Sequence, residues 1–196
     1  MKKLLLSVLG LFLFIGASYA QEYKPFKIGL GLGYAIPGGE GAGGGILIYG
    51  EPMYRINDAI AVGLRVEGAI VVRGYSETNV DDYSLDAAAI GSYTLSGQYY
   101  FSNATFRPLV GAGFGIYSLA AVSVENGDDT GAGESTTFGF YPRVGFDAGH
   151  FNFMIEYNIV PNTKIESTTL GGESVTVKNS YLSIKAGASI LGGRRK

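Results

Sequence analysis

The chain has 196 residues, no cysteine, a single histidine and a formal net charge of −2. Its length allows one domain or a small pair, and the absence of cysteine excludes disulfide scaffolds, thiolate catalysis and cysteine zinc sites. One histidine excludes a multi-histidine metal centre within the chain, and so small a net charge gives no electrostatic basis for binding nucleic acid.

The first twenty residues have the layout of a secretory signal peptide. Two lysines precede an apolar run over 4–15, and small residues follow it up to Ala20. An apolar run of about a dozen residues is too short for a spanning helix, which needs about twenty. We therefore expect a signal peptide over 1–20, cleaved after Ala20, and one domain over 21–196.

After this segment, apolar residues recur at every second position and no stretch has a helical spacing. In the clearest case, Val62, Leu64 and Val66 fall on one face, while Arg65 and Glu67 fall on the other. Such alternation predicts strands with one apolar and one polar face. Eight strands are predicted, over residues 26–34, 44–55, 60–73, 87–101, 106–122, 137–148, 151–160 and 180–190.

The connections between these strands alternate between short and long. The short ones carry Asn, Asp, Ser and Gly, which suit tight hairpins. They fall at 56–59, 102–105 and 149–150, and the long polar ones fall at 35–43, 74–86, 123–136 and 161–179. Strands joined by hairpins run antiparallel, so the predicted fold is all-β, an eight-stranded antiparallel up-and-down barrel.

The placement of charge favours a transmembrane barrel over a soluble one. The apolar faces of the predicted strands carry no Asp, Glu, Lys or Arg. A charge on the lipid face near the bilayer midplane costs about 2–4 kcal/mol, so a charge-free outer face suits lipid. The opposite faces would line a narrow lumen, in which glycines leave room for long side chains. The predicted lumen charges are Lys27, Glu51, Arg65, Glu67, Arg107, Arg143, Asp147, Glu156 and Lys185.

The region from Phe26 to Ile190 resembles the OmpA/OmpX-like eight-stranded outer-membrane β-barrels, and its aromatic residues cluster near the strand ends, as in interfacial girdles. The glycine-and-basic ending over 192–196 is similar to that of Bacteroidetes-type barrels. The resemblance implies periplasmic short turns, extracellular long loops and a location in the bacterial outer membrane. It also implies contact with outer-membrane lipid and lipopolysaccharide, insertion by the barrel assembly machinery, and a monomer.

The histidine and the lumen charges are candidates for chemistry. The lipid A deacylase barrels have a histidine and a serine two positions later on the outer half of the barrel. His150 and Asn152 have the same spacing, but His150 lies in a predicted periplasmic turn, on the opposite side. An asparagine has no nucleophilic hydroxyl, so no catalytic role is predicted. Buried charges must be paired or strongly hydrated, so the lumen charges are predicted to form a plug. The alternative is that they line a narrow gated pore.

The second long loop is the candidate for contacts with other molecules. Its aromatic and acidic residues are Tyr75, Glu77, Asp81, Asp82 and Tyr83. Carboxylates there could bind calcium or bridge to lipopolysaccharide through divalent cations, but their spacing is not that of an EF-hand. A solvated loop that contacts an extracellular ligand is therefore expected, with no cofactor or structural metal.

Taken together, these features predict an integral outer-membrane β-barrel with a structural or surface-interaction role and no enzymatic activity. The first alternative is a narrow porin-like or OmpW-like channel for small or hydrophobic solutes. The second is a soluble periplasmic barrel that binds an apolar ligand, although such a protein would carry its charges on the outer wall.

Overall fold

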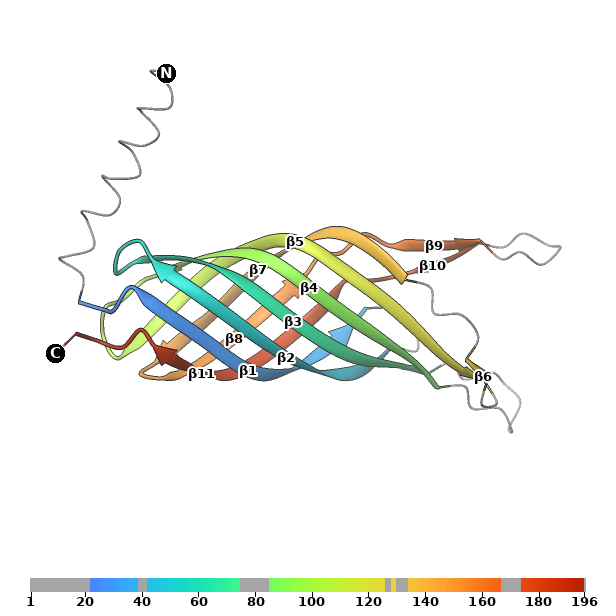
Figure 1. Ribbon diagram of the computed structural model, residues 1–196, viewed down its shortest axis with the longest axis horizontal. Helices are drawn as coiled ribbons and strands as arrows, with labels where there is room; N and C mark the ends of the chain where they lie inside the picture. Colours follow the sequence, from blue (N-terminus) through green and yellow to red (C-terminus); the bar gives the residue numbers. More distant parts are fainter. Residues whose placement is uncertain are drawn as a thin grey trace, which may run out of the picture.

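A computed structural model describes residues 22–38, 42–74, 85–125, 128–129, 134–166 and 174–195. Eight antiparallel strands form a closed barrel (Figure 1), which confirms the predicted fold class. The barrel strands are β1 (Phe26–Pro37), β2 (Ala42–Arg55), β3 (Ile60–Gly74), β4 (Leu85–Tyr100), β5 (Phe106–Glu125), β7 (Glu134–Ala148), β8 (Phe151–Asn158) and β11 (Tyr181–Leu191). The described residues include no helix that is long and apolar enough to cross a membrane.

The barrel closes because its first and last strands pair. β1 pairs with β11 from Lys27 opposite Leu191 to Pro37 opposite Tyr181, and each other barrel strand pairs with its neighbours in the chain. A closed sheet has no free edge, so its backbone N–H and C=O groups are satisfied within the barrel. Hydrocarbon surroundings impose this requirement on any spanning structure.

The short turns form as their residues predict. Asn57 Oδ1 accepts hydrogen bonds from the backbone N–H groups of Ala59 and Ile60, at 2.9 and 2.7 Å. Gly149 adopts a φ of 62°, which favours glycine, in the two-residue turn before β8. These turns and the two terminal segments of the described chain lie at one end of the barrel, which we call the short-turn end (Figure 1).

The opposite, long-loop end contains strands that the sequence pattern did not predict. β5 continues to Glu125 and pairs with β6 (Asp128–Asp129), while β9 (Thr163–Glu166) and β10 (Ser174–Val177) form a separate two-stranded sheet. Thr163 and Ile165 alternate with charged residues in β9, and two valines alternate with Ser174 and Thr176 in β10. Such β-branched residues favour strands even in a polar segment. The predicted long connections over 123–136 and 161–179 are therefore partly strand.

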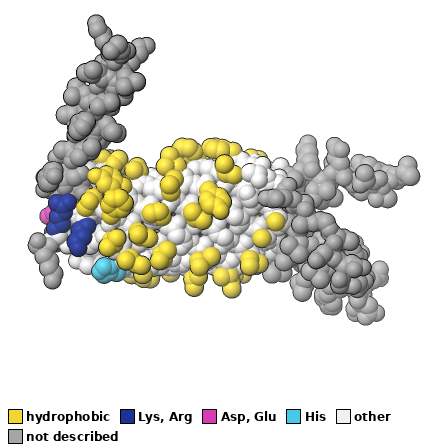
Figure 2. Space-filling model, in the orientation of Figure 1, with side chains coloured by type: hydrophobic (Ala, Val, Ile, Leu, Met, Phe, Trp, Pro, Cys, Tyr) yellow, Lys and Arg dark blue, Asp and Glu magenta, His cyan; other side chains and the backbone are white. Residues whose placement is uncertain are grey.

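The outer wall is apolar along its described length. In the described parts of the eight barrel strands, no exposed side chain is charged. Figure 2 shows hydrophobic side chains across the wall and Lys and Arg side chains at the short-turn end. Aromatic pairs lie beside the short turns, including Phe26 with Tyr54 at 5.6 Å and Phe106 with Phe146 at 4.9 Å between ring centroids. This wall has the composition of a surface in contact with lipid.

We expect Leu64→Arg, in the middle of the outer face of β3, to lower the free energy of unfolding in phospholipid vesicles by about 2–4 kcal/mol. Leu64 is exposed and pairs with Leu95, so the arginine would replace lipid-facing hydrocarbon. The control is Thr105→Arg in an exposed turn, and the measurement is urea unfolding followed by gel migration. Equal stability of the two variants would contradict a lipid-facing wall.

Candidate functional site

The inner face of the barrel gathers charged side chains from seven strands. Each of them is at most 5% exposed, although a buried charge is costly unless it is paired. The set contains all nine predicted lumen residues and one further arginine, Arg55. Its members are Lys27, Glu51, Arg55, Arg65, Glu67, Arg107, Arg143, Asp147, Glu156 and Lys185.

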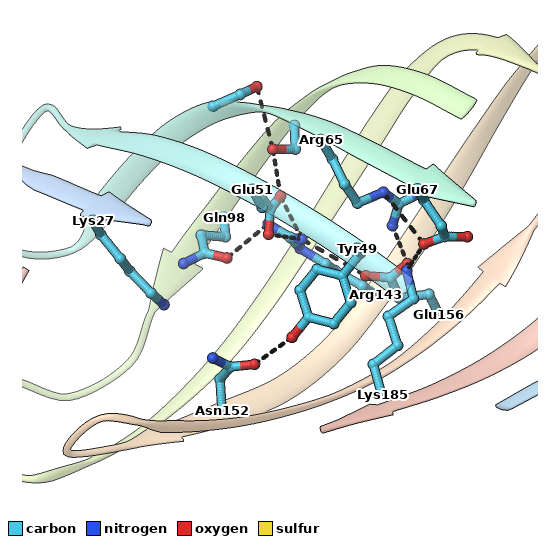
Figure 3. Close-up of polar contacts among 12 residues, drawn as sticks. Lys27, Tyr49, Glu51, Arg65, Glu67, Gln98, Arg143, Asn152, Glu156 and Lys185 are labelled. Carbon is cyan, nitrogen blue, oxygen red and sulfur yellow. Dashed lines mark hydrogen bonds and ion pairs between the residues drawn. The ribbon is translucent and has the colours of Figure 1, made fainter. Parts of the chain in front are cut away.

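The central part of this set is a four-residue cluster from β3, β8 and β11 (Figure 3). Lys185 Nζ lies 2.5 Å from Glu156 Oε2 and also contacts Glu67. Arg65 contacts Glu156 through Nη1, and its Nε lies 3.7 Å from Glu67 Oε2. Because β3 and β8 are four strands apart in the ring of eight, the pair of Arg65 and Glu156 crosses the lumen.

A second crossing pair lies closer to the short-turn end. Arg143 on β7 donates through Nη1 to both oxygens of Glu51 on β2, at 2.8 and 2.9 Å. Ser96 donates to Glu51 at 2.7 Å, and Arg143 Nη2 donates to Gln98 Oε1 at 2.7 Å. β2 and β7 are also four strands apart, so this second ion pair also crosses the interior.

A third group lies nearest the short-turn end. Lys27 Nζ donates to Asp147 Oδ2 at 2.5 Å and to the Tyr100 hydroxyl at 3.1 Å. The Tyr100 hydroxyl donates to the same aspartate oxygen at 2.8 Å. Eight of the nine predicted lumen charges therefore lie in these three groups, which together extend along the interior.

Glycines on the inner face of β5 make room for this network. A Cβ at Gly113 would lie 2.4 Å from the Tyr141 hydroxyl, and a Cβ at Gly111 would lie 2.8 Å from Arg143 Nε. Any larger residue at either position would displace the side chains of β7. These glycines therefore act by steric relief, as the sequence predicts.

Arg107 is buried in the lumen as predicted, but it does not take part in the predicted pairing of charges. No ion pair links it to a carboxylate among the described residues. Its Nε donates to the Ser102 carbonyl at 2.9 Å, its Nη2 donates to the Asp58 carbonyl, and its guanidinium lies between the rings of Tyr23 and Tyr100, 4.0 and 3.9 Å from their centroids. Arg107 lies at the short-turn opening of the lumen, which we call the mouth. Backbone carbonyls of two short turns are within its reach there and take the place of carboxylate partners.

Tyr23 closes the same mouth, and the sequence analysis missed it. Its hydroxyl bonds to the carbonyls of Asn103 and Ala104 at 3.0 and 2.9 Å, and its backbone N–H donates to Asp58. Arg55 lies over its ring at 5.0 Å. The available signal was an aromatic residue just before the first strand, which can fold back over a narrow barrel end.

The lumen near the long-loop end is filled by apolar side chains, which the sequence analysis also missed. Ala35, Leu47, Val71 and Ile90 are buried there in one cluster with inward tyrosines such as Tyr181. A signal was present in β1, β2 and β3, where the neighbours Ala35 and Ile36, Ile46 and Leu47, and Ile70 and Val71 are apolar on both faces. The lumen is thus filled in layers, with a charged middle between an apolar layer and the Tyr23 mouth.

His150 and Asn152 lie in different environments. His150 is exposed in its turn with Nδ1 2.8 Å from the Ser189 carbonyl, whereas Asn152 is buried and accepts a hydrogen bond from Tyr49 at 2.5 Å. The candidate loop residues Tyr75, Glu77, Asp81, Asp82 and Tyr83 lie outside the described residues. Within the described part, no three acidic or histidine side chains are grouped to bind a metal.

We expect Glu156→Gln to lower the free energy of unfolding by about 3–5 kcal/mol, because it leaves buried cations without their shared carboxylate. Glu22→Gln removes the exposed partner of Arg194, 2.8 Å away, and should change stability little. Urea unfolding in vesicles measures both. The same small effect from both substitutions would show that the central cluster adds no stability.

Comparisons with known proteins agree with this architecture. The family model described as "Outer membrane protein beta-barrel domain" matches residues 6–189, and no curated protein matches the sequence. Three solved structures are similar. OprG of Pseudomonas aeruginosa has a TM-score of 0.52 and 16% sequence identity, and the match covers 87% of this chain and 98% of OprG. Neisserial surface protein A has a TM-score of 0.51 and 18% identity, with 86% of this chain and 98% of that protein covered, and Ail, the attachment invasion locus protein of Yersinia pestis, has a TM-score of 0.51 and 14% identity, with 85% of this chain and 100% of Ail covered. At these identities the likeness concerns the fold alone.

Proposed function

We propose a sealed structural barrel as the function of this chain, which belongs to the outer membrane protein beta-barrel domain family and lies in the bacterial outer membrane. The observation that carries the proposal is that two ion pairs, Arg65 with Glu156 and Arg143 with Glu51, cross the lumen between opposite walls. Breaking a buried pair by removing one partner costs about 3–5 kcal/mol. A solute that displaced these groups would face a cost of this order.

The two ends of the lumen support the same role. The apolar cluster around Leu47 and Val71 excludes hydrated ions near the long loops. Tyr23 and Arg107 cover the short-turn end through bonds to backbone carbonyls. An ion would have to pass the apolar cluster and the Tyr23 mouth as well as the two ion pairs that cross the lumen.

A narrow channel is the second candidate, because some buried hydroxyls have no hydrogen-bond partner. Among the described residues these include Ser92, Thr94 and Tyr141. Buried polar atoms of this kind usually bind internal water, so the interior holds polar sites beside the two ion pairs. The apolar layer interrupts them before the long-loop end, which favours isolated waters over a continuous path.

The proposed protein has no catalytic activity and acts through its barrel and its loops. Its partners are outer-membrane lipid and lipopolysaccharide around the wall, the barrel assembly machinery during insertion, and an extracellular ligand at the second long loop. Loops on a rigid scaffold are the usual place for recognition. The barrel acts as a monomer.

We expect the purified full chain to show no steady single-channel current in a planar bilayer. The double variant Glu51→Ser with Arg143→Ser should stay silent too, because the apolar layer and the Tyr23 mouth remain. Heat-modifiable gel migration verifies insertion of each protein. Large, steady currents from the unmodified chain would overturn the sealed barrel, and a change of ion selectivity in the double variant would place the conducting path along this pair.

We expect deletion of residues 76–84 to abolish binding to host or bacterial surfaces while the barrel still inserts. Binding of labelled vesicles that contain the protein measures this, and gel migration reports insertion. The matched comparison is Asn57→Ala in a short turn at the other end. Unchanged surface binding after the deletion would dispose of the loop as an interaction site.

A further inference from the structure

A groove of about 800 Å³ crosses the outer wall over β2, β3 and β4. Its floor is formed by Gly68 on β3 and Gly91 on β4, two glycines on the outer face that pair with each other. A Cβ at either position would have no other atom within 4 Å. The rim of the groove is made by Ile46, Ile48 and Ile70, each 63–69% exposed. Small residues beside large ones thus produce a depression in the wall.

The position of the groove restricts what can fill it. It lies within the charge-free outer wall, and the residues that line it are almost all apolar. In a protein of the outer membrane this wall faces hydrocarbon, so water in the groove would have no polar partners. Side chains around an empty groove lack dispersion contacts on one side, so an apolar group that fills the groove stabilises the wall.

One end of the groove carries a polar group. Tyr34 lies three residues before the end of β1, and its ring covers Gly44, where a Cβ would lie 1.7 Å from the hydroxyl oxygen. Tyrosines near strand ends sit at the level of lipid headgroups. The groove therefore runs from the headgroup level at Tyr34 to the apolar wall at Gly68 and Gly91, the path that an acyl chain follows from its headgroup.

We propose that this groove binds one acyl chain of a membrane lipid, with the lipid headgroup beside the Tyr34 hydroxyl. A second copy of the barrel fits the shape less well, because two convex walls would meet at the isoleucine rim and leave the floor at Gly68 empty. A flexible, narrow acyl chain reaches the floor. Residues on the outer face form the floor and rim of the groove, above the buried Leu47, Ala69 and Ile90. The site is therefore separate from the charged network of the lumen.

The test uses the absence of tryptophan from the chain. Ile46→Trp places a reporter in the groove, and Ile184→Trp places a matched reporter outside it, because Tyr34 pairs with Ile46 on one side and with Ile184 on the other. Brominated-chain phosphatidylcholine, which quenches tryptophan, is titrated into each full-length variant in alkyl maltoside micelles. We expect half-maximal quenching of the groove reporter at about a fivefold lower lipid fraction, a preference of about 1 kcal/mol.

Two leucine variants assign the effect to the groove. Gly68→Leu fills the floor and should move the curve of the Ile46→Trp reporter onto that of Ile184→Trp. Gly97→Leu is the matched control, because Gly97 also has open space around it but lies in another depression of the wall. Heat-modifiable migration verifies that each variant folds.

Coincident curves for the two reporters would overturn the proposal, as would a curve that Gly68→Leu leaves unchanged. Sedimentation of the same samples tests the other occupant. A dimer that forms with the unmodified floor and disappears with Gly68→Leu would assign the groove to a second copy. None of these results depends on whether the lumen conducts ions.

Discussion

The structure depends on charge that is paired across a narrow interior. An eight-stranded barrel barely holds its own side chains, and lipid on its outside forces the charged residues inward. Arginines on β3 and β7 reach carboxylates on the opposite wall, and these long side chains fill the space that an apolar core would fill in a soluble domain. The glycines of β5 follow from this arrangement, since the neighbouring strand needs room for Tyr141 and Arg143.

The same constraint accounts for the order of the layers in the lumen. Paired charges occupy the middle of the lumen, where each has a partner on another strand. Toward the long loops the inward side chains become apolar, and toward the short turns an arginine and two tyrosines stack. The paired charges thus find most of their partners on other strands, while the hydroxyls of Ser92, Thr94 and Tyr141 have no partner among the described residues.

Much of the fold could be predicted because alternation determines which face of a strand meets lipid. In β3, Leu64 and Val66 face outward while Arg65 and Glu67 face the lumen, as their positions in the sequence require. The partners of these charges could not be predicted, since pairing across a lumen depends on strand register and barrel closure. Arg107 shows this limit: its position in the pattern matches that of Arg143, yet its surroundings are turn carbonyls and tyrosine rings. The partners of Tyr23 could not be predicted either, because it lies outside any strand and alternation gives it no face; only its position just before β1 indicated that it could cover the barrel end.

The strands differ in length, and this has a consequence for the outer rim. β5 has 20 residues and β4 has 16, whereas β8 has 8 and β1 has 12. About 9–11 tilted residues cross the hydrocarbon layer, so β5 continues for about ten residues and roughly 25 Å beyond it at 3.3 Å per residue and a 45° tilt. The barrel therefore extends well beyond the hydrocarbon layer at β4 and β5, and the hairpin of β9 and β10, which connects β8 to β11, projects from the same end (Figure 1). With the long-loop end at the cell surface, as proposed above, large molecules there meet two projections from the barrel, the ends of β4 and β5 and the hairpin of β9 and β10.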